Sequence, residues 1–401
     1  MSIQLDADKV RDLRKEFGEA FYLLDSAQFR QNFQELKGAF LQYYPRFNIA
    51  YSYKTNYTPK LCEIVDNLGG YAEVVSEMEL ELAYRIGVKT ENIIWNGPVK
   101  NPVILQDYLL RGGMVNIDSY EEFLTIREIV KAYPEKSFRL GIRCNFDVQD
   151  GVISRFGVDI QGPEYDEMHA YMETTPNVKF VSLQCHFAKR QIEYWPARVQ
   201  GMLSLVERMK IRPERIDLGG ALYGKMADSL KNQFSAPIPG YADYARLAGA
   251  FYETFGDCGP ELIIEPGSAL VGDCMKFLGT VKTIKTVRGK TIATILGSQK
   301  NISMTGINPP MEIIHMGKGK KIADADIVGF TCIEGDLLYK GFTGEIGAGD
   351  AVVFGNCGSY SIVMKPPFIL PNFPVIDISG GKTELIKRPE SFDDIFRSYT
   401  L

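Results

Sequence analysis

The stretch YAEVVSEMELELAYRIGVKTENIIWNG (residues 71–97) contains the unit from which most of this chain is built. Short runs rich in β-branched and aromatic residues open and close it. Between them, SEMELELAYRIG (76–87) spaces its apolar residues three and four apart. The first pattern predicts buried strands and the second an amphipathic helix. The stretch therefore predicts a strand–helix–strand unit with parallel strands.

Strands of the same kind recur through the first two thirds of the chain. The runs are FNIAYSYK (47–54), YAEVVS (71–76), NIIWNG (92–97), MVNIDS (114–119), SFRLGIRC (137–144), VKFVSLQCHF (178–187), RIDLGG (215–220) and ELIIEPG (261–267). Segments with helical periodicity lie between them, for example VQGMLSLVERMK (199–210). Strands and helices that alternate in this way predict a parallel (β/α)8 barrel of the TIM type.

The sequence changes character after Gly267. Further runs have strand character but are broken by Gly, Pro and Asp, without long helical segments between them: 276–287, 290–297, 325–333 and 351–356. The run AFYLLD (20–25) is also a strand candidate. We therefore predict two domains, a barrel at 27–271 and an all-β domain, a sandwich or barrel, formed by 1–26 and 272–401.

Composition limits the class of function. A net charge of −5 provides no basic surface of the kind that nucleic acids or anionic membranes attract. The polar first residues contain no signal core, and no apolar run reaches the roughly 18 residues of a membrane span. The seven cysteines are scattered and form no CxxC pair, which predicts neither a disulfide framework nor a metal site. We expect a soluble, cytoplasmic protein.

Polar residues and glycines follow the predicted strands at their carboxyl ends, where barrel enzymes carry their chemistry. They are Lys54, Glu73, Ser76, Asn96, Asp118, Arg143, Asn145, His186, Gly219, Gly220 and Glu265. Taken singly, each has a structural explanation, such as a solvated lysine or a turn glycine. Gly219, Gly220 and Gly267 follow the last two strands, where barrels commonly bind phosphate. A phosphate cradle, a lysine, a carboxylate and an imidazole are together what pyridoxal 5'-phosphate (PLP) requires.

Nine motifs in order resemble those of the fold-type III PLP enzymes, in the group of diaminopimelate, ornithine and carboxynorspermidine decarboxylases. They are AYSYKTN around Lys54, AEVVSEMELELAYRIGV (72–88), IRCN (142–145), SRFGV (154–158), the strand ending in His186, DLGG (217–220), EPG (265–267), CIEGD (332–336) and GSY (358–360). The resemblance covers most of the chain. It implies an alanine racemase-like fold, PLP as the cofactor and decarboxylation of an amino acid.

The resemblance also implies roles for the matching residues. Lys54 would bind PLP as a Schiff base, and Glu265 would keep the pyridine nitrogen protonated so that the ring can take up electrons from Cα. Cys332 would reprotonate Cα across the interface of a homodimer with shared active sites. The remaining roles concern the cofactor: His186 would stack on its ring, Gly219, Gly220, Gly267 and Tyr360 would hold its phosphate, and Glu79 and Arg143 would support it.

The chain departs from the family pattern at the phosphate. The family's serine three residues after the histidine is Lys189 here, and its arginine after Glu-Pro-Gly is Ser268. We interpret this exchange as a positive charge that has moved to Lys189. The alternative is that Lys189 points into solvent and that the phosphate is bound more weakly.

The chain also departs from the pattern at the substrate. Diaminopimelate decarboxylases carry a glutamate directly after the cysteine, whereas here Ile333 follows Cys332 and Glu334 comes one residue later. On a strand, that shift turns the carboxylate to the other face. The segment 296–313 lacks the family's Arg-Pro pattern, whose arginine binds the distal carboxylate. We expect another amino acid as substrate, in a specialised pathway such as siderophore, polyamine or antibiotic synthesis. Candidate substrate contacts are Cys332, Glu334 and Asp336.

Two alternative functions stay open. One is a PLP-dependent amino-acid racemase or epimerase of the same fold. Glu265 argues against an alanine racemase, because that enzyme places an arginine at the pyridine nitrogen. The other is a non-catalytic PLP-binding protein, which resembles the isolated barrel, whereas this chain adds a β domain and Cys332.

Overall fold

The computed structural model describes residues 5–209, 213–302 and 308–400, and these residues form two compact units. The barrel unit contains Asn32–Tyr223 and Ile238–Ala269, and the β unit contains Met1–Gln31, Gly224–Pro237 and Leu270–Leu401. Some residues of the predicted segments lie outside the described residues. They are 1–4 and 401 of the predicted β domain, 210–212 of the predicted barrel, which include Lys210 at the end of the helical segment 199–210, and 303–307 of the segment 296–313.

The barrel unit is built on eight parallel strands. They are β2 (Phe47–Ser52), β3 (Tyr71–Val74), β4 (Ile93–Trp95), β5 (Met114–Ile117), β6 (Phe138–Asn145), β8 (Val178–Gln184), β9 (Arg215–Asp217) and β10 (Glu261–Ile264). β10 pairs with β2, and β5 pairs with β6, so the sheet closes on itself. The predicted (β/α)8 barrel and its eight strands are confirmed. A short strand, β7 (Val158–Asp159), pairs with the end of β6.

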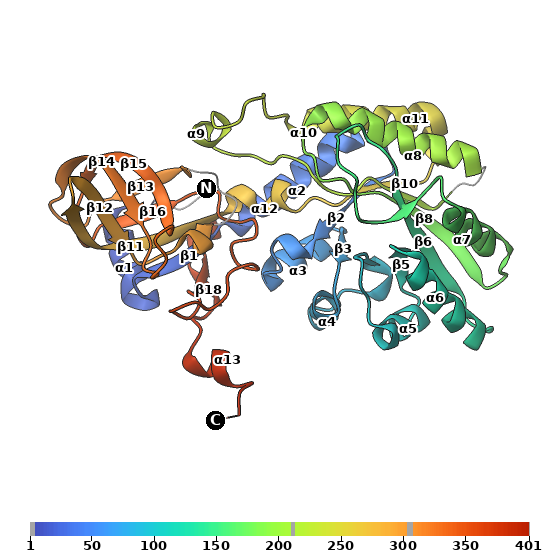
Figure 1. Cartoon of the computed structure of the whole chain (residues 1–401), viewed down its shortest axis with the longest axis horizontal. Helices are drawn as coiled ribbons and strands as arrows, with labels where there is room; N and C mark the ends of the chain where they lie inside the picture. Colours follow the sequence, from blue (N-terminus) through green and yellow to red (C-terminus); the bar gives the residue numbers. More distant parts are fainter. Residues whose placement is uncertain (1–4, 210–212, 303–307, 401) are drawn as a thin grey trace. The chain divides into compact units, whose positions relative to one another are not determined.

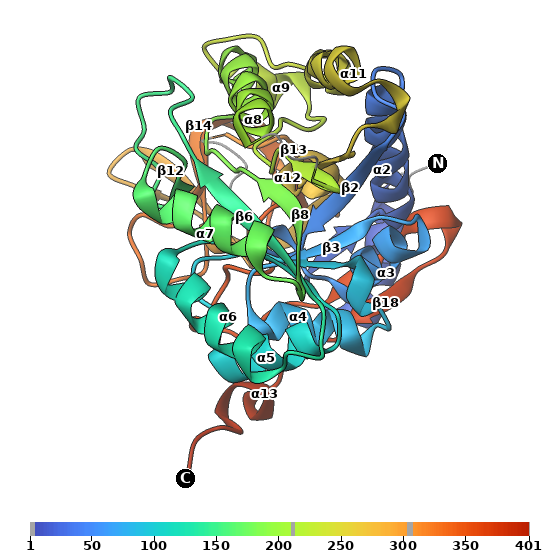
Figure 2. The ribbon, with the colours of Figure 1, turned by 90° about the vertical axis from the view of Figure 1, so that its right-hand side faces the viewer.

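Helices surround these strands, as Figure 2 shows for α3 to α8. The helices that accompany the barrel are α2 (Ser26–Leu41), α3 (Pro59–Asn67), α4 (Glu77–Arg85), α5 (Pro102–Leu110), α6 (Tyr120–Ala132), α7 (Pro163–Thr174), α8 (Trp195–Met209), α10 (Tyr241–Ala245) and α11 (Gly249–Phe255). Two of them begin at serines whose side chains accept a backbone N–H three residues later, Ser76 for α4 and Ser119 for α6. The caps fix where each strand-to-helix loop ends, and these loops carry the site.

The interior of the barrel is filled with side chains. Ala50, Ile94, Met114, Val181 and Ile263 come from five different strands and form one buried cluster. A barrel packed in this way has no channel along its axis.

The β unit contains a nine-stranded sheet, whose strands other than β17 are labelled in Figure 1. Its strands are β1 (Ala20–Leu24), β11 (Met275–Val287), β12 (Lys290–Ile295), β13 (Met311–Ile314), β14 (Lys320–Val328), β15 (Leu337–Ile346), β16 (Ala351–Phe354), β17 (Val375–Asp377) and β18 (Glu384–Lys387). Its helices are short: α1 (Ala7–Phe17), α9 (Asp228–Lys231) and α13 (Phe392–Phe396), and α12 (Ser268–Val271) follows β10. β1 pairs with β11 and β17, which confirms that the N-terminal strand joins this sheet.

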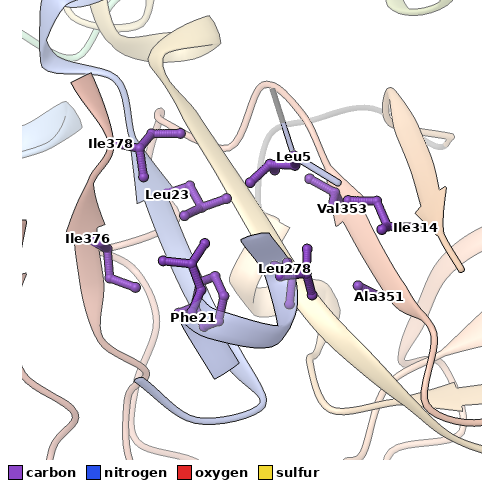
Figure 3. Packing of buried hydrophobic residues seen from close by; sticks show 11 residues of the cluster. Leu5, Phe21, Leu23, Leu278, Ile314, Ala351, Val353, Ile376 and Ile378 are labelled. Carbon is purple, nitrogen blue, oxygen red and sulfur yellow. The ribbon is translucent and has the colours of Figure 1, made fainter. Parts of the chain in front are cut away.

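The core of the β unit explains why the N-terminal strand belongs there. Phe21 and Leu23 of β1 pack with Leu278 of β11 and Ile376 of β17, and all four side chains are buried (Figure 3). Val10 of α1 belongs to the same cluster. Because these side chains come from both ends of the sequence, the sheet could not bury this face without its first strand.

The structure differs from the sequence analysis at two places. The segment Gly224–Pro237 belongs to the β unit, where Nε2 of Gln233 donates to the carbonyl oxygen of Asn308 at 2.6 Å. The sequence analysis placed this segment in the barrel domain, and the boundaries 27–271 stay a proposal.

The second difference concerns the predicted strand 325–333. β14 ends at Val328, and Cys332 lies in the turn that leads to β15. The backbone N–H of Gly329 donates to the carbonyl oxygen of Asp336 at 2.8 Å and closes this turn. The predicted change of face between Ile333 and Glu334 is therefore wrong, because neither residue is on a strand.

Candidate active site

Lys54 lies at the carboxyl end of β2, in the single helical turn Tyr53–Thr55. Its Nζ donates to Oε2 of Glu73 at 2.8 Å, and the hydroxyl of Ser52 donates to the same oxygen. The Glu73 side chain is 1% exposed and that of Lys54 is 34% exposed. The amine is thus anchored at the rim and its side chain is partly exposed, as a group that reacts with an incoming carbonyl must be.

Amide side chains from neighbouring strands join Glu73 to Glu265. Nδ2 of Asn96 donates to Oε1 of Glu73 at 3.1 Å and to Oε1 of Glu265 at 2.6 Å. Nε2 of Gln184 donates to the same Glu265 oxygen at 3.1 Å. Nδ2 of Asn116 donates to Oδ1 of Asn96 at 2.8 Å, which fixes the orientation of that amide. Oε1 of Glu265 therefore accepts two hydrogen bonds from amide side chains, those of Asn96 and Gln184, and Oε2 accepts neither of them.

His186 lies beside the free oxygen of Glu265 and is oriented by a glycine. The backbone N–H of Gly220 donates to Nδ1 of His186 at 2.9 Å, while Oε2 of Glu265 is 3.5 Å from the same nitrogen. Since Nδ1 accepts, the proton of the neutral ring is on Nε2. Burial lowers the pKa of His186, which favours this neutral form.

Glu265 and Asp217 form a buried pair of carboxyl groups, 2% and 1% exposed. Burial and the nearby charge of Glu265 raise the pKa of Asp217 well above its usual value. Burial alone would also raise the pKa of Glu265, but the neighbouring His186 and the positive charge of Lys54 reverse that shift and lower it. At neutral pH the pair therefore holds one proton on Asp217 and one negative charge on Glu265.

Close packing at the end of the barrel requires the glycines after β9 and β10. Gly219 has φ +68°, and a Cβ there would lie 2.3 Å from the carbonyl oxygen of Cys185. A Cβ on Gly267 would lie 1.9 Å from Oγ1 of Thr55. A side chain at either position would strike a neighbouring strand end, so only glycine fits there. Bare backbone of this kind can approach a phosphate more closely than backbone with side chains.

The backbone N–H groups of this cradle differ in whether they already have a hydrogen-bond acceptor. Those of Gly219 and Gly220 already donate to Asp217 and His186, at 2.8 Å and 2.9 Å. The N–H of Ala221 has no acceptor among the described residues, and Ala221 has φ +65°, a strained value for a residue with a side chain. Direct phosphate contacts by Gly219 and Gly220 stay predictions, and Ala221 is the residue with a free donor.

Glu79 and Arg143 brace neighbouring strand ends. Oε2 of Glu79 accepts the backbone N–H of Val75 at 2.7 Å, and burial raises the pKa of Glu79 to about 7. Nη1 of Arg143 donates to Oδ1 of Asp118 at 2.9 Å, and its guanidinium lies 4.7 Å from the centre of the Phe156 ring. These contacts hold the loops after β3, β5 and β6. The expected support of the cofactor by Glu79 and Arg143 stays a prediction.

Four of the expected site residues belong to the β unit. They are Cys332, Glu334, Asp336 and Tyr360. Asp336 is buried. Its carboxylate accepts one hydrogen bond from the hydroxyl of Thr331 at 2.6 Å and another from the backbone N–H of Gln299 at 2.7 Å. In this chain Asp336 thus stabilises the turn that presents Cys332. The expected contacts of these four residues with cofactor and substrate stay predictions.

Three contributors to the site were not among the residues predicted from the sequence: Gln184, Asp217 and Ala221. Gln184 was detectable, because it stands two residues before His186 on the same predicted strand and therefore on the same face. Asp217 and Ala221 stand within and directly after the quoted DLGG motif, and their roles depend on Glu265 and on a positive φ. No local pattern reports either of these conditions.

A parallel (β/α)8 barrel with an anchored lysine, an oriented imidazole, an ionised buried carboxylate and a glycine cradle at one rim defines the class of PLP-binding barrels. The model of the family described as pyridoxal-dependent decarboxylase, pyridoxal binding domain, matches residues 27–272. The chain belongs to this family. PLP is its cofactor and the decarboxylation of an amino acid is its reaction, which confirms both predictions.

Individual relatives agree over nearly the whole length. The diaminopimelate decarboxylase of Aquifex aeolicus is 26% identical, with 98% of this chain and 94% of the relative covered. That of Methanothermobacter thermautotrophicus is 25% identical, with the same coverage.

Solved structures show the same fold. The structure of AQ1208 from Aquifex aeolicus has a TM-score of 0.81 at 25% identity and covers 96% of this chain and 93% of that one. Diaminopimelate decarboxylase from M. jannaschii in complex with L-lysine has a TM-score of 0.81 at 21% identity, with 97% and 94% covered. Among the described residues, no helix combines the length and apolar character needed to cross a membrane.

Proposed function

We propose that this enzyme decarboxylates an amino acid other than diaminopimelate. The observation that carries the proposal is Ile333, which directly follows Cys332 and is 52% exposed in the turn between β14 and β15. A carboxylate at that position could pair with a distal ammonium group of the substrate, whereas an isoleucine cannot. A charged group left without a partner in a closed site costs about 1–3 kcal/mol or more, so the site disfavours such a substrate.

Each residue of the barrel rim has a distinct part in the reaction. Bound PLP supplies the electron sink for the bond that breaks at Cα. Lys54 would hold the cofactor, and Glu73, 2.8 Å from Nζ, can take the proton that the amine must lose before it reacts. Glu265, ionised because Asp217 carries the proton of the pair, would keep a proton on the ring nitrogen. His186, in its neutral form, would cover the ring of the cofactor.

The proton that replaces the carboxylate at Cα is assigned to Cys332 in this proposal. Cys332 is exposed, and it lies in a turn that the buried Asp336 braces. An exposed thiol on a braced turn suits a group that enters the site of a second copy, in a homodimer with shared active sites. Glu334, one residue after Ile333, is the remaining acidic candidate for the substrate side chain. A cytoplasmic location and a specialised biosynthetic pathway complete the proposal.

The test is product analysis. PLP-loaded enzyme is incubated with meso-diaminopimelate, lysine, ornithine and a panel of other α-amino acids, and mass spectrometry detects loss of CO2. Lys54→Ala serves as the matched inactive control. We expect an amino acid other than diaminopimelate to react fastest. Diaminopimelate as the best substrate would overturn the proposal. Exchange and inversion at Cα in deuterated water without CO2 release would point to a racemase instead.

A further inference from the structure

The phosphate cradle contains few donors of its own. Two of its N–H groups, those of Gly219 and Gly220, are already committed to Asp217 and His186. Ser268, which follows Gly267, carries no charge. A phosphate group close to neutral pH carries roughly −1.5 to −2 charges. Partial charges from a few N–H groups do not balance this, so a cation at the rim of the barrel is expected.

Arg190 lies beside Ser268, at the edge of the phosphate cradle. Its Nη2 donates to Oγ of Ser268 at 3.4 Å, although 78 residues separate the two in sequence. The backbone carbonyl of Arg190 accepts the hydroxyl of the buried Tyr244 at 2.5 Å, and its guanidinium lies 5.9 Å from the centre of the Tyr223 ring. No carboxylate among the described residues pairs with Arg190. Its charge is therefore held beside the cradle and is available to an anion.

The neighbouring Lys189 is less suited than Arg190 to bind the phosphate. It is half-buried, and within the described parts of the chain it makes no hydrogen bond or ion pair. Nothing fixes its ammonium group near Ser268 or the glycines. A flexible lysine loses more conformational entropy on binding than a preorganised arginine.

A second arginine lies behind the glycines. Arg198 of α8 is 1% exposed, and its guanidinium donates to the carbonyl oxygens of Gly220 at 2.8 Å and of Leu218 and Phe187 at 3.1 Å. Its Nε is buried without a partner in the part of the chain that the structure describes. Its guanidinium also lies 4.3 Å from the centre of the Trp195 ring, but a buried cation that pairs with no carboxylate among the described residues is costly unless an anion comes close. Arg198 thus holds the loop that contains Gly219 and Gly220 and adds positive electrostatic potential there.

We propose that Arg190 binds the phosphate of PLP in this enzyme, in place of an arginine after Glu-Pro-Gly, and that Arg198 is the positioning residue that holds the glycine loop. The charge at the phosphate has moved to the segment between β8 and α8. This inference uses the cofactor assignment and is independent of the proposed substrate.

The test compares PLP with pyridoxal, which lacks the phosphate. Apoenzyme is titrated with each compound and the dissociation constants are measured. We expect Arg190→Ala to weaken PLP binding by about tenfold to a hundredfold, the scale of a charge-assisted contact, and to leave pyridoxal binding unchanged. Inorganic phosphate should compete with PLP in the unmodified enzyme more strongly than in the variant. Adding Ser268→Arg to Arg190→Ala should restore most of the PLP affinity.

Three further variants decide between explanations. Arg246→Ala removes a surface arginine that is 62% exposed and should change neither constant. Arg198→Lys retains the charge but cannot reach all three carbonyls, so PLP binding should weaken while the preference for PLP over pyridoxal persists. If Lys189→Ala weakens PLP binding and Arg190→Ala does not, the proposal is wrong. It is also wrong if Arg190→Ala weakens PLP and pyridoxal equally, because the effect is then structural.

Discussion

Nδ2 of Asn96 donates to Oε1 of Glu265 at 2.6 Å and so joins the end of β4 to the end of β10 across the mouth of the barrel. This bond fixes the plane of the carboxylate. Together with Gln184 it occupies Oε1, so Oε2, which lies 3.5 Å from Nδ1 of His186, is the oxygen that would accept the proton of a bound ring nitrogen. The catalytic carboxylate is therefore oriented before the cofactor arrives.

Asn96→Ala should reduce kcat by about tenfold to a hundredfold, because a hydrogen bond to a charged group contributes roughly 1.5–3 kcal/mol. Glu265→Ala should reduce it further, since the ring nitrogen then loses its partner. Steady-state kinetics measure both effects. Thermal unfolding of Asn96→Ala serves as the control, because a large drop in Tm would mean that the network serves folding instead.

Lys54→Ala should abolish covalent attachment of PLP. Borohydride reduction of the unmodified enzyme, followed by peptide mass spectrometry, should place the label on Lys54, the lysine that Glu73 anchors. The variant should show no label. A label on Lys60, Lys100 or Lys189 would contradict the assignment.

Gly267→Ala should destabilise the enzyme by about 1–3 kcal/mol, the usual cost of overpacking. The new Cβ would lie 1.9 Å from Oγ1 of Thr55. PLP affinity should fall as the cradle is displaced. Thr55→Gly in the same chain removes Oγ1 and also the Thr55 Cβ, which would lie 2.7 Å from the new Cβ, and should recover part of both losses. Chemical denaturation and PLP titration measure the two effects, and a double variant no better than Gly267→Ala would rule out the clash as the cause.

Cys332→Ala should reduce turnover by about tenfold or more, the scale of a lost proton donor. PLP binding should stay unchanged, because Cys332 is an exposed thiol of the β unit. Exposed Cys258→Ala is the matched control and should leave turnover unchanged. Full activity in Cys332→Ala would remove this residue from the mechanism.

Glu79→Gln should change how stability depends on pH. The pKa of Glu79 is raised from 4.5 to about 7 in the folded chain, so the folded state holds the proton more tightly than the unfolded chain. The stabilisation from this group is complete below about pH 4.5 and is lost as pH rises through about 7. The full difference is roughly 3 kcal/mol.

The variant has no proton to lose at this position. Its free energy of unfolding should therefore rise relative to the unmodified enzyme between about pH 5 and about pH 8. Urea unfolding at several pH values provides the measurement. Glu81→Gln, on the same helix but 60% exposed, should follow the unmodified enzyme. Parallel curves for Glu79→Gln and the unmodified enzyme would show that Glu79 titrates normally.

The strands of the barrel were predictable because strand period and helix period are local properties of a sequence. The positions of Lys54, His186 and Glu265 at strand ends followed from the same pattern, and their resemblance to a family supplied roles. The turn at Cys332 was not predictable in this way. The run 325–333 has strand composition, but Asp336 bends the chain by accepting hydrogen bonds from Thr331 and Gln299.

By itself the sequence determined the barrel, the N-terminal strand of the β unit and the chemical groups at the rim, because each depends on residues close together in the chain. Only the tertiary structure decided that Asp217 and Glu265 hold one proton between them. It also decided that Arg190 is the cation beside the glycine cradle. Asp217 and Glu265 are adjacent because β9 and β10 pair. Arg190 reaches Ser268 across 78 residues because the loop after β8 folds over the end of β10. Partnerships of that kind are set by packing between distant segments, and no local pattern in the sequence encodes them.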